Sequence, residues 1–189
     1  MRIEFYAAIK TAEPFLPAGT VIAREQTYVH TFYKKEATAQ QPATSKEEGN
    51  LVAFSGPDFK ATFDKQSGLL TSYLYKKHEY ILNGQGPRPF FWRAPTDNDY
   101  GANLPVRLKA WKEASYQEPK AESFQVTPGS NATTIKVTYR FPQTDARWDI
   151  TYKIYASGVI KVDNRFVAEG DQAPMIPRVG LRMQLPESF

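Results

Sequence analysis

The sequence predicts an all-β protein, built as an antiparallel β-sandwich, and three observations favour this fold class. Apolar residues recur at every second position through most of the chain, with charged or hydroxyl residues between them, as in strands that bury one face. Turn-forming residues such as Asp64–Gly68 separate these runs. The composition is 41% hydrophobic and 14% aromatic, which is typical of a globular chain with a packed core.

The first alternating run lies at the N-terminus, where Ile3, Phe5, Ala7 and Ile9 share one face. Only about three strands precede the next change of composition, too few for an independent sheet domain. They are therefore expected to belong to a larger domain or to pair with another segment or chain.

Residues 34–50 are rich in Ala, Thr, Gln, Ser and charged residues, lack a sustained period and end in Gly-Asn. This composition predicts a linker. The predicted organisation is thus residues 1–40 as the end of one domain, 41–50 as linker and 51–189 as part of a large β-sandwich.

Within the sandwich, Phe59–Phe63 alternates and is followed by the Asp64–Gly68 turn and a second strand at Leu69–Tyr75, which predicts a β-hairpin. The clearest strands are 135–141 and 148–154, each expected to bury one face. We place the rings of Phe63, Tyr139, Trp148 and Tyr152 in the core.

The chain then turns at Ala156–Gly158 into a strand at Val159–Val167, and a last run at Leu181, Met183 and Leu185 closes the pattern. Consecutive antiparallel strands in a meander are the simplest topology for such runs. One helix is predicted at Pro105–Ser115, since proline suits a first turn and Leu108 and Trp111 lie three residues apart.

The charge and residue usage exclude several function classes. The net charge of +4 comes from 24 basic and 20 acidic residues that are interspersed, so no basic block predicts a nucleic-acid partner. The absence of cysteine excludes disulfides, thiolate zinc sites and a thiol nucleophile. No run approaches the roughly 18 apolar residues of a membrane span, so no membrane partner is expected.

The densest polar cluster is WRAPTDNDYG, from Trp92 to Gly101, and it has two interpretations. In the functional one, Asp97, Asn98 and Asp99 accept hydrogen bonds from sugar hydroxyls beside a cleft. In the structural one, the same side chains cap backbone amides and pair with Arg93. Asx turns are common and binding loops are few, which favours the structural interpretation.

Asp97 and Asp99 do not form the acid pair of a glycosidase in this interpretation. They lie two apart on one segment, whereas the catalytic carboxylates flank the glycosidic bond at about 5–9 Å from opposite sides. No bidentate glutamate follows at the spacing of a calcium loop. We therefore predict no catalytic residue, no metal site and no cofactor in this chain.

The run PRPFFWRAPTDNDYG, from Pro87 to Gly101, resembles the start of the last large β domain in bacterial β-galactosidases of glycoside hydrolase family 2. Three further segments agree in order: DKQSGLLTSY at 64–73, the Trp111-centred helix before Tyr116, and IPRVGLRMQLP at 176–186. Residues 1–40 resemble the closing strands of the immunoglobulin-like sandwich that precedes that domain.

The resemblance implies a parent enzyme that hydrolyses terminal β-D-galactosides, in which a separate TIM-barrel domain holds the catalytic glutamates and a Mg or Na site. This chain would supply the end of the fourth domain and the first part of the fifth, small-chain, domain. That domain is a galactose mutarotase-like supersandwich which packs on the barrel and shapes the sugar pocket. By itself the chain is expected to be inactive.

In the family, a mobile loop begins at the glycine that ends this motif and lies at the active-site entrance. In this chain the loop corresponds to Gly101 and the residues just after it. The candidate substrate-rim or carbohydrate contacts are Arg93, Asp97, Asn98, Asp99, Tyr100, Gly101 and Asn103. Only Ala102, Asn103 and Leu104 stand between that glycine and Pro105.

Several alternatives stay open from the sequence. The chain could instead be a free-standing carbohydrate-binding or domain-assembly module, and a homo-oligomer is compatible with either interpretation. The sequence does not distinguish bacterial cytoplasm from periplasm, nor one galactoside from another.

Overall fold

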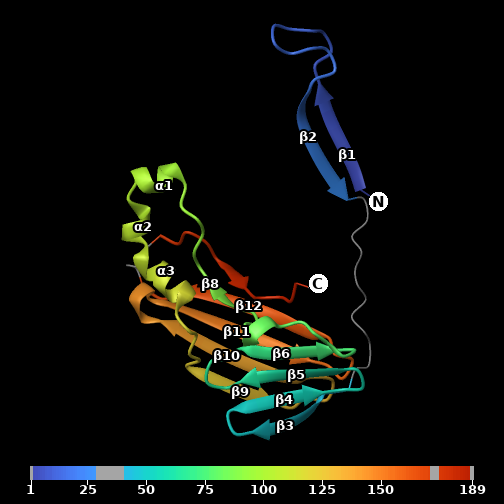
Figure 1. The fold of residues 1–189 in the computed structure, drawn as a ribbon, viewed down its shortest axis with the longest axis vertical. Helices are drawn as coiled ribbons and strands as arrows, with labels where there is room; N and C mark the ends of the chain where they lie inside the picture. The colour runs from blue at the N-terminus through green and yellow to red at the C-terminus, as the bar shows by residue number, and fades with distance from the viewer. Residues whose placement is uncertain (1, 29–40, 171–174, 188–189) are drawn as a thin grey trace. The chain divides into compact units, whose positions relative to one another are not determined.

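The computed structural model describes residues 2–28, 41–170 and 175–187 (Figure 1). The chain divides into two compact units, Met1–Thr38 and Ala39–Phe189. The boundary between them falls inside residues 34–50, the segment whose composition indicated a linker.

The first unit is an antiparallel hairpin of β1 (Arg2–Ala8) and β2 (Val21–Tyr28), in which Arg2 pairs with Tyr28 and Ala7 with Ala23. About three strands were expected before the linker, and residues 2–28 contain these two. The apolar face predicted on β1 is not buried within this unit, since Phe5 is 56% exposed. A two-stranded hairpin has no second layer to cover either face.

The described residues of the second unit form three antiparallel sheets and three short helices. The five-stranded sheet runs in the order β3 (Thr44–Glu48), β4 (Leu51–Ser55), β5 (Phe59–Asp64), β6 (Leu70–Tyr75), β7 (His78–Glu79). The four-stranded sheet runs in the order β12 (Ile160–Ala168), β11 (Ala146–Ile154), β10 (Thr133–Phe141), β9 (Ser123–Thr127).

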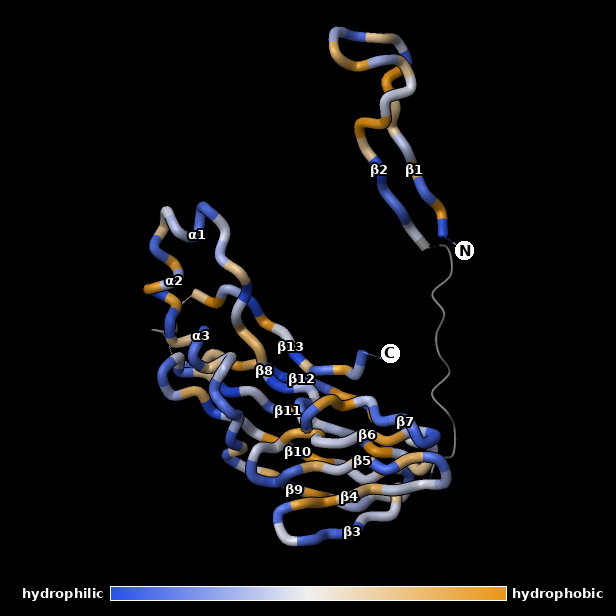
Figure 2. Tube along the Cα trace, in the orientation of Figure 1, coloured by the Kyte–Doolittle hydropathy of each residue, from blue (hydrophilic) through white to orange (hydrophobic). Residues whose placement is uncertain are grey.

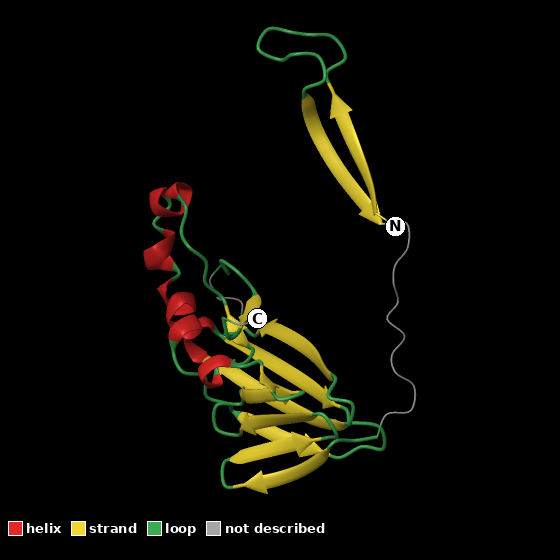
Figure 3. Cartoon of the chain, turned by 45° about the vertical axis from the view of Figure 1, so that its right-hand side comes forward, coloured by secondary structure: helices red, strands yellow, loops and turns green. Residues whose placement is uncertain are grey.

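The third sheet is the pair β8 (Arg88–Phe90) and β13 (Gly180–Arg182). The helices are α1 (Asp97–Gly101), α2 (Leu104–Arg107) and α3 (Lys109–Tyr116), with single 3₁₀ turns η1 (Leu82–Gly84) and η2 (Pro142–Thr144). Figure 3 shows the helices following one another along one side of the strands.

The two larger sheets face each other and bury the core between them. Phe63 of β5 contacts the ring of Tyr152 in β11 at 5.1 Å between centroids and that of Phe124 in β9 at 6.4 Å. Apolar and polar positions alternate along these strands (Figure 2). The predicted core rings Phe63, Tyr139, Trp148 and Tyr152 are all at most 3% exposed. The all-β, antiparallel sandwich is therefore confirmed.

The predicted linker is wrong at its C-terminal end, because Thr44–Glu48 forms β3 and pairs with β4. Gly49, at φ 58°, begins the turn between them. Every residue of β3 is exposed. An edge strand held by backbone hydrogen bonds needs no apolar face, so its sequence carries no alternation.

The meander is confirmed for β9 to β12, which pair in chain order, and the 59–75 hairpin is also confirmed. The last run differs, because β13 pairs with β8 and leaves β12 at the edge of its sheet. Backbone bonds between Gln184 and Gln85, and from the Leu82 N–H to the Gln184 carbonyl, hold this segment beside η1.

The single helix predicted at Pro105–Ser115 is two helices that meet at Leu108, whose φ of −108° and ψ of 18° interrupt the helical path. Leu108 and Trp111 are both buried, at 4% and 0% exposure. The packing side predicted from their spacing is thus confirmed, although the helix is not continuous.

The turn at Gly68 should be sensitive to a small substitution, because it combines a positive φ with close packing. Gly68 has φ 75°, and a Cβ there would lie 2.5 Å from the Tyr139 hydroxyl and from a methyl of Val137. Gly68→Ala should lower the free energy of unfolding by about 2–4 kcal/mol, from backbone strain and overpacking.

Urea denaturation measures this change, and Gly101→Ala is the matched control. A Cβ added at Gly101 would meet no atom within 4 Å, so that variant should unfold at the urea concentration of the parent chain. Equal stability of the two variants would contradict the close packing of Gly68 on the facing sheet.

Candidate functional site

The candidate segment begins directly after a fixed aromatic anchor. The Phe91 ring lies within 4.8–5.7 Å of four other rings, those of Trp111, Phe141, Trp148 and Phe166. Phe91 is fully buried. Because α3, β10, β11 and β12 each contribute one ring, Phe91 is held by four separate elements. The chain continues from β8 toward α1 (Figure 1).

The backbone at this anchor is also fixed. The Phe91 N–H donates to the Ser115 hydroxyl at 2.9 Å, and that hydroxyl donates to the Trp111 carbonyl at 2.7 Å. Ser115 is fully buried on α3. The last helix therefore holds the start of the candidate segment by a hydrogen bond as well as by packing.

The helix α1 begins with a capping box at Thr96. The Thr96 hydroxyl accepts from the Asp99 N–H at 3.4 Å, and the Asp99 carboxylate accepts from the Thr96 N–H at 2.7 Å. Two backbone donors that a helix start leaves open are thereby satisfied. No helix was predicted from the sequence at these residues, and the capping box makes them one helical turn.

Arg93 closes the same turn with a bidentate ion pair. Its two terminal nitrogens donate to the two Asp99 carboxylate oxygens at 2.5 and 2.9 Å. Asp99 is 8% exposed, whereas the Arg93 side chain is 40% exposed. Parallel guanidinium–carboxylate bonds fix orientation as well as charge.

These contacts determine the chemistry available to Asp99. The hydrogen bond from Arg93, followed by that from the Thr96 backbone, lowers the pKa of Asp99 to about 2. At neutral pH this group is a carboxylate whose oxygens already accept hydrogen bonds, so it is unsuited to donate a proton. This is the arrangement that the structural interpretation describes for Asp99 and Arg93.

The other candidates are exposed on the same segment, residues 92–103, which we name the arm. Asp97, Asn98 and Tyr100 project from α1, and Asn103 follows in the left-handed region at φ 54°. Tyr100 is 64% exposed, and Gly101 faces open space. The seven candidates therefore include a clamp, Arg93–Asp99, and an exposed polar row, Asp97, Asn98, Tyr100 and Asn103.

A cavity of about 210 Å³ lies beside the clamp. Its lining includes residues that the sequence did not assign to a site: Trp92, Pro95, Leu104, Pro105, Leu108, Met175, Ile176 and Pro177. The Thr96-x-x-Asp99 spacing is a readable capping-box signal. By contrast, no local pattern could place residues 175–177 beside Trp92.

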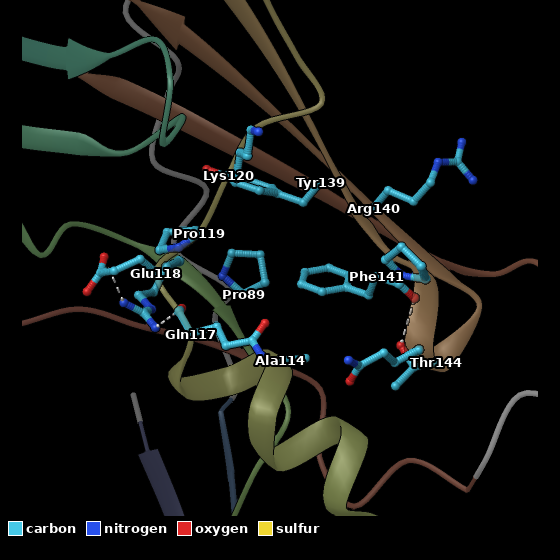
Figure 4. A pocket seen from close by; sticks show the side chains of 13 residues that line it. Pro89, Ala114, Gln117, Glu118, Pro119, Lys120, Tyr139, Arg140, Phe141 and Thr144 are labelled. Atoms are coloured by element: carbon cyan, nitrogen blue, oxygen red, sulfur yellow. Dashed lines mark hydrogen bonds and ion pairs between the residues drawn. The ribbon is translucent and has the colours of Figure 1, made fainter.

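A second cavity, of about 310 Å³, lies between the end of α3 and the end of β10. Figure 4 shows Pro89, Phe141 and Lys120 on its wall, with the Thr144 hydroxyl bonded to the Phe141 carbonyl. The lining of this cavity contains one carboxylate, that of Glu118. The lining of the first cavity also contains one carboxylate, that of Asp99. Neither lining offers the two opposed carboxyl groups that glycoside hydrolysis requires.

Among the described residues, no cluster of three or more His, Asp or Glu side chains could hold a metal ion. The helices found in the described ranges are also too short or too polar to cross a bilayer.

The Arg93–Asp99 clamp should give a pH-dependent contribution to stability. Because the folded pKa of Asp99 lies below its unfolded value of about 4, the contribution is complete above pH 4 and is lost as pH falls toward 2. Asp99→Asn should therefore be less stable than the parent chain at pH 7, and the difference should shrink at pH 3.

Urea unfolding of both chains at pH 7 and pH 3 measures this difference. Asp97→Asn is the control, because it removes a carboxylate from the same first turn without breaking the Arg93 pair. A stability difference between Asp99→Asn and the parent that is unchanged over this range would disprove the clamp.

Comparison with known proteins identifies the family. The family model described as "Beta galactosidase small chain" matches residues 55–189. A β-galactosidase of Priestia megaterium is 31% identical over 152 residues, covering 80% of this chain and 14% of that protein. A β-galactosidase of Clostridium acetobutylicum is 32% identical over 139 residues, covering 73% of this chain and 15% of that protein.

A β-galactosidase small subunit of Latilactobacillus sakei is 29% identical over 157 residues, covering 71% of this chain and 48% of that protein. The chain thus spans about one-seventh of the two long relatives and about half of the small subunit. The matched region contains the four-stranded sheet, strands β5 to β7 of the five-stranded sheet and the segment that carries the candidate residues, and the chain belongs to the β-galactosidase small chain family.

Proposed function

We propose that this chain is a non-catalytic part of a β-galactosidase that hydrolyses terminal β-D-galactosides, and that it contributes scaffold and active-site rim. Relatives named β-galactosidase support the substrate class. The catalytic glutamates and any Mg or Na ion belong, in this proposal, to a TIM-barrel domain of the same enzyme.

The observation that carries the rim assignment is the exposed polar row on a clamped arm. Asp97, Asn98, Tyr100 and Asn103 offer carboxylate, amide and hydroxyl groups to solvent, which suit a neutral polyol. The Arg93–Asp99 pair and the Phe91 anchor hold their backbone in place. Preorganised polar groups bind with less loss of side-chain and loop entropy.

The non-catalytic assignment is supported by the state of the acids. Asp99, the one buried carboxylate of the cluster, is bonded to Arg93 and Thr96. Asp97 is exposed and lies two residues away on the same helical turn. A general acid and a nucleophile would have to face each other across the sugar.

The first test is hydrolysis of a chromogenic β-galactoside by the 189-residue chain. We expect no turnover above the rate of buffer alone, since the opposed acids are supplied elsewhere. Asp97→Ala is the diagnostic variant: hydrolysis by the parent chain that disappears in this variant would refute the proposal.

The second test is a titration of the chain with galactose, followed by backbone amide shifts in NMR, with mannose as the matched sugar. Rim contact predicts small, galactose-dependent shifts at Asp97–Asn103, and Asn98→Ala with Asn103→Ala should remove them. Shifts confined to the strands of either sheet would instead favour a free-standing carbohydrate-binding module.

A domain-assembly role is the second candidate, and the observation that favours it is the edge strand β12. Val162 on this strand is 37% exposed, and exposed residues occupy both faces along the middle of the strand. Exposed strand edges pair readily with other chains. Light scattering over a wide concentration range measures this directly, and a constant monomer mass would count against it.

A further inference from the structure

The two-stranded sheet places two arginines opposite each other. Arg88 of β8 and Arg182 of β13 are direct register partners, so their side chains leave the same face with Cβ atoms about 5 Å apart. Like charges in this position destabilise a strand pair. A compensating negative charge at this face would remove that cost.

Arg88 is held in a buried setting by neutral acceptors. Its side chain is 10% exposed, and it donates to the Ser115 carbonyl at 3.0 Å, the Gln117 carbonyl at 2.8 Å and the Gln85 side-chain oxygen at 3.2 Å. Burial lowers the pKa of Arg88, and Arg182 lowers it further, while Glu118 opposes both. A buried cation is costly unless it is paired.

The counter-charge present is weak. The Glu118 carboxylate lies 4.0 Å from Arg88, and its side chain is 80% exposed, where solvent screens most of the attraction. Within the described ranges, Arg182 has no ion pair with a carboxylate. Within the described ranges, the one printed ion pair of these two guanidinium groups is therefore the long, solvated contact between Arg88 and Glu118.

Arg182 is nevertheless fixed in position by aromatic rings. Its guanidinium lies 5.4 Å from the centre of the Phe90 ring and 5.9 Å from that of Tyr116. These two rings contact each other edge to face at 5.5 Å. Stacking on a ring uses the face of a guanidinium and leaves its edge N–H groups available for an acceptor.

A cavity of about 370 Å³ opens between these groups, and we name it the Arg88–Arg182 cleft. The remaining lining residues are Asn83, Gln85, Tyr116, Glu118, Met183 and Gln184. Three of them carry side-chain amides, which can donate to oxygen. The cleft thus combines two guanidinium groups with neutral donors.

We propose that the Arg88–Arg182 cleft binds a small oxyanion, a carboxylate or a phosphate, between the two guanidinium groups. Both ligands present the paired oxygens that a guanidinium edge recognises. The bound anion compensates the cross-strand repulsion and the burial of Arg88. Glu118 competes for the same charge, so the cleft should bind more tightly without it. This inference does not depend on the proposed galactosidase role.

Isothermal titration of the 189-residue chain with inorganic phosphate, and separately with acetate, tests the proposal at an ionic strength held constant with sodium chloride. We expect saturable binding with a dissociation constant below about 10 mM. Arg182→Gln should weaken it at least about tenfold, and Glu118→Gln should tighten it severalfold. The ratio of the two affinities distinguishes a phosphate ligand from a carboxylate ligand.

Arg165→Gln is the matched control, because it removes one positive charge from exposed β12 and should leave both affinities within about twofold. Circular dichroism and the thermal unfolding midpoint check that Arg182→Gln remains folded. If Arg182→Gln does not fold, the tighter binding expected of Glu118→Gln tests the proposal. Absence of saturation up to about 100 mM in both the parent and Glu118→Gln would overturn the proposal. Equal weakening by Arg182→Gln and Arg165→Gln would do the same.

Discussion

The packing of Phe91 against four aromatic rings is the contact on which the position of the candidate site depends. The rings come from α3 and three strands of one sheet, so the anchor forms only when these elements have assembled. Truncation of such a buried ring costs about 3–5 kcal/mol. The arm that follows is short and polar, and the buried Phe91 ring fixes the position at which it begins.

Charged groups on this arm serve two different purposes. Asp99 is buried, bonded to Arg93 and to the Thr96 N–H, and holds the helical turn together. Asp97, two residues earlier, is exposed at the same turn. One carboxylate is used for structure and the other faces solvent, where an external ligand can reach it. The two acids of this turn therefore stand in different surroundings, one bonded to Arg93 and one open to solvent.

The sequence was informative where burial is periodic. Strands 135–141 and 148–154 lie between a packed face and a wetter one, so their alternation predicted both strands and their core residues. It failed at Thr44–Glu48, because a fully exposed edge strand has no apolar face. It also failed to place the last run, since the pairing of β13 with β8 is supported by backbone bonds to η1 and its neighbour Gln85. Such contacts leave no local pattern.

The candidate residues show the same limit. Residue types and spacing identified the Trp92–Gly101 cluster and the pairing of Arg93 with an acid. They did not identify which acid would be buried, because that follows from the capping geometry.

The sequence by itself thus determined the fold class, the core strands, the polar cluster and the family resemblance. Each of these follows from local periodicity or from a continuous motif. Only the tertiary structure decided the partner of the last strand, the cavity wall formed by Met175–Pro177, and the opposition of Arg88 and Arg182. Each of these joins segments far apart in the chain. Such contacts follow from the free energy of the assembled sheets and are not encoded in any single segment.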